Sequence, residues 1–298
     1  MTAMEPTPAV DYVPQRGDRL RRAFFRFSQS KLSMLGAAMV AIVLFFTLFG
    51  TLLAPYPNHV AGAVDTASRF LAPSMAHPFG TNELGQDVLS LVMAGTTVSV
   101  LAAFSVVIIG TLIGTLVGAV AGFAGGWVDE ILMRLTDLVL TIPSLILAMA
   151  IAAALGPGFG NMVIAIAMSW WPGYARLVRG EVLAAREEVY VTAARALGAT
   201  PTRILLRHIL PNTISPIIVK MSLDMGFAIL TVAGLGFIGI GVRPPTPEWG
   251  TLLSISRSYM PDYWWTAMAP GMAMFLAVFG FNLLGDGLRD LLDPKARR

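Results

Sequence analysis

The sequence lacks cysteine and is poor in charged residues. Without cysteine there is no disulfide framework, no thiolate metal site and no cysteine nucleophile. The three histidines, His59, His77 and His208, are far apart in the sequence and form no HExxH zinc motif. Charged residues make up 13% of the chain, whereas soluble domains carry about 25%. These shortages exclude thiol chemistry and set the chain apart from ordinary soluble proteins.

Hydrophobic residues make up 55% of the chain and its mean hydropathy is +0.69, as in integral membrane proteins. A membrane-spanning helix needs about 20 apolar residues. Gly156-Pro157-Gly158 interrupts one long apolar stretch, because glycine and proline together favour a turn. The apolar runs predict an all-α integral membrane domain over residues 34–290, with six spans at about 34–54, 96–121, 130–155, 159–180, 213–240 and 263–285.

The first apolar run, Met34–Ala54, follows several arginines, as the hydrophobic part of a signal peptide does. That part of a signal peptide is about 7–15 residues long. The present run is longer, and it follows a polar tail over residues 1–33. We therefore expect a retained first helix rather than a cleaved signal.

The basic residues predict the orientation, because cytoplasmic connections of membrane proteins are rich in lysine and arginine. If the N-terminal tail is cytoplasmic, all but three of the 21 basic residues fall on the cytoplasmic side. The exceptions are Arg69, Arg243 and Arg257. Six spans then bring the C-terminal tail, residues 291–298, back to the cytoplasm.

The cytoplasmic connection between the fourth and fifth predicted spans, residues 187–211, has the pattern helix, sharp turn, helix, stop. Gly198 suits the left-handed position after a first helix. Thr200 suits the N-cap of a second helix, and Pro201 its first position. Pro211 is expected to end that helix, because a proline disfavours the helical conformation of the residue before it.

Both helices of this loop are too short to be stable alone in water. They share an apolar stripe, which is expected to pack either on the protein's own helix ends or against a cytosolic partner. The stripe consists of Val191, Ala194, Leu197, Ile204, Leu205 and Ile209.

One run in the loop has a recognisable spacing: Thr192-Ala193-Ala194, three residues, Gly198, nine residues, and then His208-Ile209-Leu210-Pro211. It resembles the EAA motif, E-A-A-x3-G-x9-I-x-L-P, of permease subunits of prokaryotic ATP-binding-cassette (ABC) importers. Thr192 stands in place of the glutamate and His208 in place of the isoleucine. The resemblance implies that the loop couples to an ATPase subunit through Ala193, Ala194, Gly198, Thr200, Pro201, His208, Leu210 and Pro211.

Two further stretches, predicted to be external, narrow the resemblance. Residues 77–90, HPFGTNELGQDVLS, are similar to the HPFGTDxxGRDVLSR stretch of the C-type permease subunit of the oligopeptide/dipeptide/nickel group. Asn82, Gln86 and Leu91 depart from that pattern. Residues 241–250, GVRPPTPEWG, look like the corresponding second external stretch. The resemblance implies the type I ABC importer permease fold, with six spans and both termini cytoplasmic, in a multi-pass protein of the prokaryotic plasma membrane.

The resemblance also implies partners: a second homologous permease, two ABC ATPases, an extracytoplasmic substrate-binding protein and membrane lipid, but no nucleic acid. The chain has no GxxxxGK[ST] phosphate loop, so ATP and Mg²⁺ belong to the partner ATPases. We expect a non-catalytic subunit that has no cofactor, no metal site and no catalytic residue. An intramembrane hydrolase is disfavoured, because Asp224 is isolated and no histidine lies in a predicted span.

Di- or oligopeptides are the expected cargo. Nickel, glutathione or another small solute is the alternative within the same class, and a channel or scaffold with a docked cytosolic regulator is the alternative outside it. Asp224, Gly234 and Gly236 are candidates for the translocation path or a gate. The glycines near the outer end of the fifth span predict either an unwound segment beside the path or a loose helix end.

Two features leave a choice between packing and partner contact. Gly110, Gly114, Gly118 and Gly122 lie on one face of the second span, where small residues let helices approach closely, either within the subunit or against the second permease. The pairs Glu130–Arg134 and Lys220–Asp224 are spaced for ion pairs on one helix face. They either solvate helix ends or belong to a contact or gate.

Trp249, Trp264 and Trp265 are expected at the outer interface, with no ligand role.

Overall fold

The computed structural model describes residue 25 and residues 27–292, so most of the N-terminal tail and nearly all of the predicted C-terminal tail lie outside it. The described residues form helices and loops, with a single isolated β-bridge between Thr81 and Asp87. In chain order the elements are α2 (Lys31–Leu53), α3 (Pro57–Val60), a 3₁₀ turn η1 (Thr66–Ser68), α4 (Val88–Ala124), α5 (Gly126–Leu140), α6 (Ser144–Leu155), α7 (Phe159–Arg186), α8 (Val189–Ala196), α9 (Pro201–Ile204), a π-helical turn η2 (Leu205–Ile209), α10 (Leu210–Ile238), α11 (Trp249–Ser256) and α12 (Trp265–Leu292).

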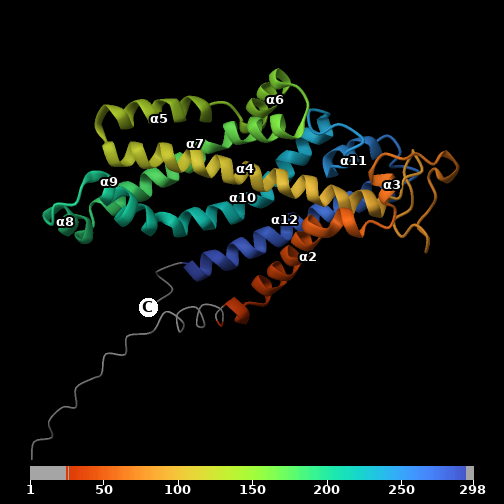
Figure 1. Cartoon of the computed structure of the whole chain (residues 1–298), viewed down its shortest axis with the longest axis horizontal. Coiled ribbons are helices and arrows are strands. Elements are labelled where there is room, and N and C mark those ends of the chain that lie inside the picture. Colours follow the sequence, from red (N-terminus) through yellow and green to blue (C-terminus); the bar gives the residue numbers. More distant parts are fainter. Residues whose placement is uncertain (1–24, 26, 293–298) are drawn as a thin grey trace, which may run out of the picture.

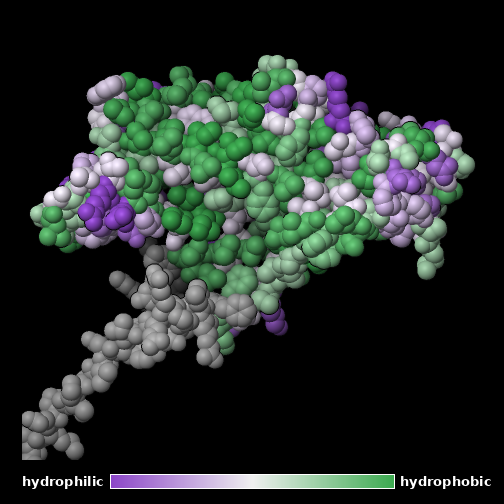
Figure 2. Space-filling model, viewed as in Figure 1, coloured by the Kyte–Doolittle hydropathy of each residue, from purple (hydrophilic) through white to green (hydrophobic). Residues whose placement is uncertain are grey.

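The long helices run roughly side by side along the longest axis of the molecule (Figure 1). The loop of α8 and α9 lies at one end, and α3, α11 and the segment before α4 lie at the other. In the space-filling view, hydrophobic residues cover the middle and most hydrophilic residues gather towards the two ends (Figure 2). This distribution is the one expected of a protein whose middle lies in hydrocarbon.

By length and hydropathy, four helical stretches of the described chain can cross a membrane: α2, α4, the continuous stretch Pro201–Ile238, and α12. The bent pair α5–α6 makes a fifth if it counts as one broken span. The six predicted spans are therefore not all recovered on this measure. α7 is not among these stretches, and its second half carries Arg176, Arg179 and Glu181.

The predicted continuous helix over residues 130–155 is wrong in one respect, because the structure divides it. α5 and α6 meet at an angle of 87°. Pro143 lies at the break, where its ring removes one backbone N–H and disfavours a helical Ile142. The predicted turn at Gly156-Pro157-Gly158 is present, since α6 ends at Leu155 and α7 begins at Phe159.

The glycine stripe of α4 packs against α7 within the subunit. A Cβ at Gly114 would lie 2.5 Å from the carbonyl oxygen of Trp171, and one at Gly122 would lie 3.0 Å from that of Arg179. Gly118 is equally close to the backbone of Ala175. Of the two readings of this stripe, packing inside the subunit is the one observed.

Candidate functional site: the cytoplasmic loop, the polar groove and the external segments

The turn between α8 and α9 has the backbone geometry that the sequence predicts. Gly198 follows the C-cap residue Leu197 and has φ +79°, in the left-handed region. Its N–H donates to the Arg195 carbonyl, and the next N–H, of Ala199, donates to the Ala194 carbonyl. A Cβ at Gly198 would meet no atom within 4 Å. Glycine is therefore favoured at this position by the backbone angle, and lack of space plays no part.

The start of the second loop helix is also as predicted. Thr200 is the N-cap of α9, and its hydroxyl oxygen accepts a hydrogen bond from the Arg203 N–H at 3.4 Å. Pro201 is the first helical residue, where its missing N–H leaves no hydrogen bond unmade.

The prediction that Pro211 ends this helix is wrong. The chain continues from α9 through the π-helical turn Leu205–Ile209 directly into α10. In that turn the Leu210 N–H donates to the Leu205 carbonyl, five residues back. The wider π turn changes the hydrogen-bonding register just before Pro211, which has no N–H and whose ring would crowd an α-helical turn. The loop is therefore joined to α10 without a break.

Part of the apolar stripe of the loop is buried within the protein, and part of it is exposed. Val191, Ile204 and Ile209 are buried in a cluster with residues of α7 and α10, among them Val182 and Ile217. Leu197, by contrast, is 88% exposed at the tip of the turn, and Val189 at the start of α8 is 81% exposed. The buried part holds the loop on its own helix ends, whereas Leu197 of the stripe and Val189 outside it are two separate exposed apolar side chains.

Ion pairs join α5 to α7 beside the loop. The Arg179 guanidinium donates to both oxygens of Asp129, at 2.6 and 2.7 Å. Arg176 donates to Asp137 at 2.7 Å. These contacts tie the amphipathic helix α5 to the helix that leads into the loop. They also place Asp129 in a structural role that the sequence did not reveal, because its partner is 50 residues away.

The candidate path residues do not form one site. Lys220 and Asp224 make the predicted ion pair, at 3.0 Å, and line a polar groove of about 610 Å³ among α7, α10 and α12. Gly234 and Gly236 lie further along α10, at least about 15 Å from Asp224 at 1.5 Å per residue. Both glycines are helical, so of the two alternatives for this stretch the unwound segment is not observed at these positions, and α10 ends at left-handed Gly239, φ +87°.

Glu248 is a buried residue that sequence reasoning missed. It caps α11, and its carboxylate accepts hydrogen bonds from the Gly250 and Thr251 N–H groups. The Ser99 hydroxyl of α4 also donates to it. Gly236 of α10 lies against the same carboxylate. The sequence carried little signal for this role, because glutamate is not among the residues preferred at an N-cap, which are Ser, Thr, Asp, Asn and Gly.

The first external stretch is held by polar contacts around Asp87. Asp87 caps α4 through the Ser90 N–H, and its other oxygen lies 2.9 Å from Nδ1 of His77. The Asp87 N–H donates to Nδ1 of His59. Burial raises the pKa of the nearby Glu83 carboxyl above its usual value. In the stretch 77–90, therefore, motif residues fix the entry of the chain into α4.

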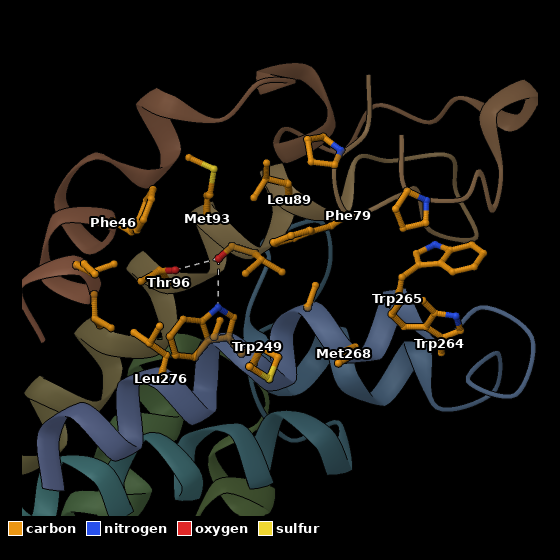
Figure 3. Close-up of a pocket in the computed structure, with 18 residues that line it drawn as sticks. Phe46, Phe79, Leu89, Met93, Thr96, Trp249, Trp264, Trp265, Met268 and Leu276 are labelled. Carbon is orange, nitrogen blue, oxygen red and sulfur yellow. Dashed lines mark hydrogen bonds between the residues drawn. The ribbon is translucent and has the colours of Figure 1, made fainter. Parts of the chain in front are cut away.

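The described residues contain no group of three or more His, Asp or Glu side chains placed to hold a metal ion. A second cavity, of about 590 Å³, lies near the outer end of α4 and has an apolar lining that includes Trp249, Trp264 and Trp265 (Figure 3). These tryptophans, predicted only as interface anchors, thus also line a cavity.

Comparison with known proteins identifies the family. Residues 114–298 match the family described as "binding-protein-dependent transport system inner membrane component", and residues 19–73 match the "N-terminal TM domain of oligopeptide transport permease C".

Among curated relatives, the chain is 45% identical to the probable D,D-dipeptide transport system permease protein DdpC of Escherichia coli, over 99% of this chain and 98% of that protein. It is 43% identical to the glutathione transport system permease protein GsiD of Shigella flexneri, over 91% of this chain and 89% of that one. It is 40% identical to the dipeptide transport system permease protein DppC of Alkalihalophilus pseudofirmus, over 93% and 90%. The chain belongs to the binding-protein-dependent transport system inner membrane components, a family of non-catalytic, multi-pass permease subunits of ABC importers.

Proposed function

We propose that this chain is one of two permease subunits of an ATP-driven importer that carries di- or oligopeptides across the plasma membrane. In this proposal α2, α4, the α5–α6 pair, α7, α10 and α12 make six crossings, with both termini cytoplasmic. The asymmetry of the basic residues supports that orientation, since all but three of 21 fall on one side. The partners are a second permease, two ABC ATPases and an extracytoplasmic binding protein.

The observation that carries the coupling role is the exposure of two apolar side chains, Val189 and Leu197, on a loop whose apolar residues Val191, Ile204 and Ile209 are buried. A partner that covers these two side chains removes apolar area from water, which favours docking at this turn. The stripe beneath them is buried against α7 and α10, so the loop is held firmly enough to transmit force. The residues of the EAA-like run, Ala193 to Pro211, form the helix pair that would lie in a groove of the ATPase.

The route from the loop into the membrane is the unbroken connection of α9, η2 and α10. A displacement of the loop moves α10 directly, because no flexible linker separates the two. α10 also carries the Lys220–Asp224 pair in the polar groove and reaches the external end at Gly236, against Glu248. This path gives Asp224 and Gly236 their proposed places at the inner and outer ends of a gate.

The peptide assignment follows the relatives, two of which are named as dipeptide permeases. Glutathione, the substrate named for a third relative, is itself a small peptide and is the second candidate. The separate binding protein is expected to select between them, and the pathway in this chain to accept both.

The test is Leu197→Asp in the complete importer, reconstituted in liposomes with its binding protein and a labelled dipeptide. We expect peptide uptake to fall at least tenfold and the ATPase subunits to be lost on purification, because a buried, unpaired carboxylate replaces an apolar contact. Glu187→Gln, at an exposed position of the same loop, is the matched control and keeps uptake. Full uptake by Leu197→Asp contradicts the coupling role. If the wild-type importer takes up another solute but no peptide, the proposed substrate is contradicted and the coupling role is not.

A further inference from the structure

The apolar cavity at the outer end of the molecule lies among α2, α4 and α12 (Figure 3). These are three of the helices that can cross a membrane. Phe46 comes from α2, Met93 and Thr96 from α4, and Leu276 from α12, while Trp249 of α11 lies against the same space. We propose that this cavity binds one acyl chain of a membrane phospholipid.

The lining has the chemistry of a hydrocarbon site. None of the described residues around the cavity carries a charge. The Thr96 hydroxyl and the Trp249 indole N–H both donate to the Val92 carbonyl, at 3.0 and 3.2 Å. The Trp265 indole N–H donates to the Thr81 carbonyl at 3.2 Å. These three side-chain donors already have partners, and the remaining donor of the lining, the indole N–H of Trp264, belongs to a residue that is 54% exposed, so a polar ligand gains little inside the cavity.

Because the donors inside the cavity are already hydrogen-bonded, binding of a peptide or of a trapped water molecule is disfavoured. A peptide with charged ends would lose its hydration without gaining an opposite charge, which is strongly unfavourable. A buried water needs about 2–4 polar partners, and these donors are engaged. An acyl chain needs neither, and burial of apolar area alone favours it.

The cavity is open at the surface of the subunit, between helices that can cross a membrane. Ile42 on α2, Met268 and Met272 on α12, and Trp264 just before α12 line the cavity and are exposed on the molecular surface. At membrane depth such side chains are in contact with hydrocarbon, so a chain enters sideways without crossing a polar barrier. The methionines add unbranched, polarizable walls that adapt to a flexible ligand.

The aromatic residues give the bound chain a direction. Trp264, Trp265 and Phe79 lie at one end of the cavity, and Phe46 and Leu276 lie at the other (Figure 3). Tryptophan is enriched at the level of lipid headgroups. The headgroup is therefore placed near Trp264, and the methyl end of the chain near Phe46 and Leu276.

Size separates a lipid chain from a helix of the second permease. A spanning helix about 30 Å long and about 10 Å across occupies roughly 2,000 Å³. The cavity, at about 590 Å³, holds only a fraction of such a helix. Its volume is in the range of about 300–1,000 Å³ that is usual for sites of small ligands.

The probe for this site is a phosphatidylethanolamine with a diazirine at the end of one acyl chain. The full-length subunit, assembled with its partner subunits in nanodiscs that contain this lipid, is illuminated and its peptides are analysed by mass spectrometry. We expect adducts concentrated around Phe46 and Leu276. The lipid-facing surface around Leu112, exposed on α4, serves as the reference for general lipid contact. Equal labelling of the cavity and of the Leu112 surface overturns the proposal.

Two variants fill the space independently. Ala269→Phe and Ala273→Phe each place a ring into the cavity, and each is expected to abolish the cavity adducts. Leu112→Phe is the matched control and keeps them. If either variant assembles and its cavity adducts are unchanged, the proposal is overturned. If neither variant assembles, the labelling pattern of the wild-type protein decides whether the proposal holds. A photoreactive benzoylphenylalanine in place of Met272 then identifies the neighbour: lipid is the expected product, and a cross-link to the second permease overturns the proposal.

Discussion

The hydroxyl of Ser99 in α4 donates a 3.0 Å hydrogen bond to Oε1 of Glu248, 149 residues later in the chain. The same hydroxyl accepts a hydrogen bond from the Trp249 N–H at 3.1 Å. One serine thus fixes both the capping residue and the first residue of α11. Because Glu248 also lies against Gly236, this contact joins α4, α10 and α11 at the external end of the molecule.

Glu248→Ala is predicted to loosen that end. The change leaves the Gly250 and Thr251 N–H groups without the acceptor that caps α11, and loss of an N-cap costs typically about 1 kcal/mol, with about 1–3 kcal/mol more for buried groups left unpaired. A lower melting temperature of the purified complex and faster proteolysis between α10 and α11 are the expected results. Thr246→Ala, at an exposed position of the same connection, is the control. Melting of the Glu248→Ala protein at the wild-type temperature contradicts the capping role.

The loss of uptake caused by substituting Gly198 is predicted to depend on how well the new residue adopts the left-handed backbone conformation, and not on the size of its side chain. Asparagine tolerates the left-handed region, whereas a β-branched residue there costs about 1–2 kcal/mol or more. Peptide uptake is therefore expected to decrease in the order glycine, asparagine, valine, with each variant still present in the membrane. Gly180→Ala, in an open position of α7, keeps uptake. If Gly198→Val transports as well as Gly198→Asn, the turn does not need its left-handed residue.

Gly114→Leu is predicted to separate α4 from α7. Even a Cβ at this position lies too close to the α7 backbone at Trp171 and Ala175, so the two helices must move apart. Overpacking of this kind costs about 1–3 kcal/mol and often more. The expected result is a sharp fall in the amount of subunit in the membrane. Gly160→Leu, at a position of α7 where a Cβ meets nothing within 4 Å, is the control. Normal accumulation of Gly114→Leu would show that the helices do not need this close approach.

The ion pair between Asp129 and Arg179 is predicted to stabilise the contact of α5 with α7. The Asp129 side chain is 17% exposed and that of Arg179 is 34% exposed, and the geometry is bidentate. A double-mutant cycle with Asp129→Ala and Arg179→Ala, measured by thermal unfolding of the complex, is expected to give a coupling of about 0.5–3 kcal/mol. The exposed pair Glu130–Arg134, at 3.6 Å, is the internal control and is expected to give close to zero. Equal couplings for the two pairs would contradict this prediction.

Local features of the loop could be predicted because they depend on neighbouring residues. The left-handed Gly198, the Thr200 cap and the Lys220–Asp224 pair each follow from side chains a few residues apart. Which residues of the apolar stripe are buried could not be predicted from the sequence, because the burial of Ile209 and the exposure of Leu197 depend on where α7 and α10 lie. The continuity through Pro211 was missed for a related reason: a π turn is rare, and only its packing in the folded loop favours it.

By itself, the sequence determined the membrane class, the strongest spans, the hinge at Gly198 and the family, because hydropathy, turn chemistry and motif spacing are local properties of the chain. Tertiary structure alone decided the partner of Asp129 and the burial of Glu248 against Ser99, whereas the 87° bend between α5 and α6 lies at Pro143, a local signal. The two contacts join segments far apart in sequence, and the free energy of such contacts depends on distances that exist only once the helices have packed.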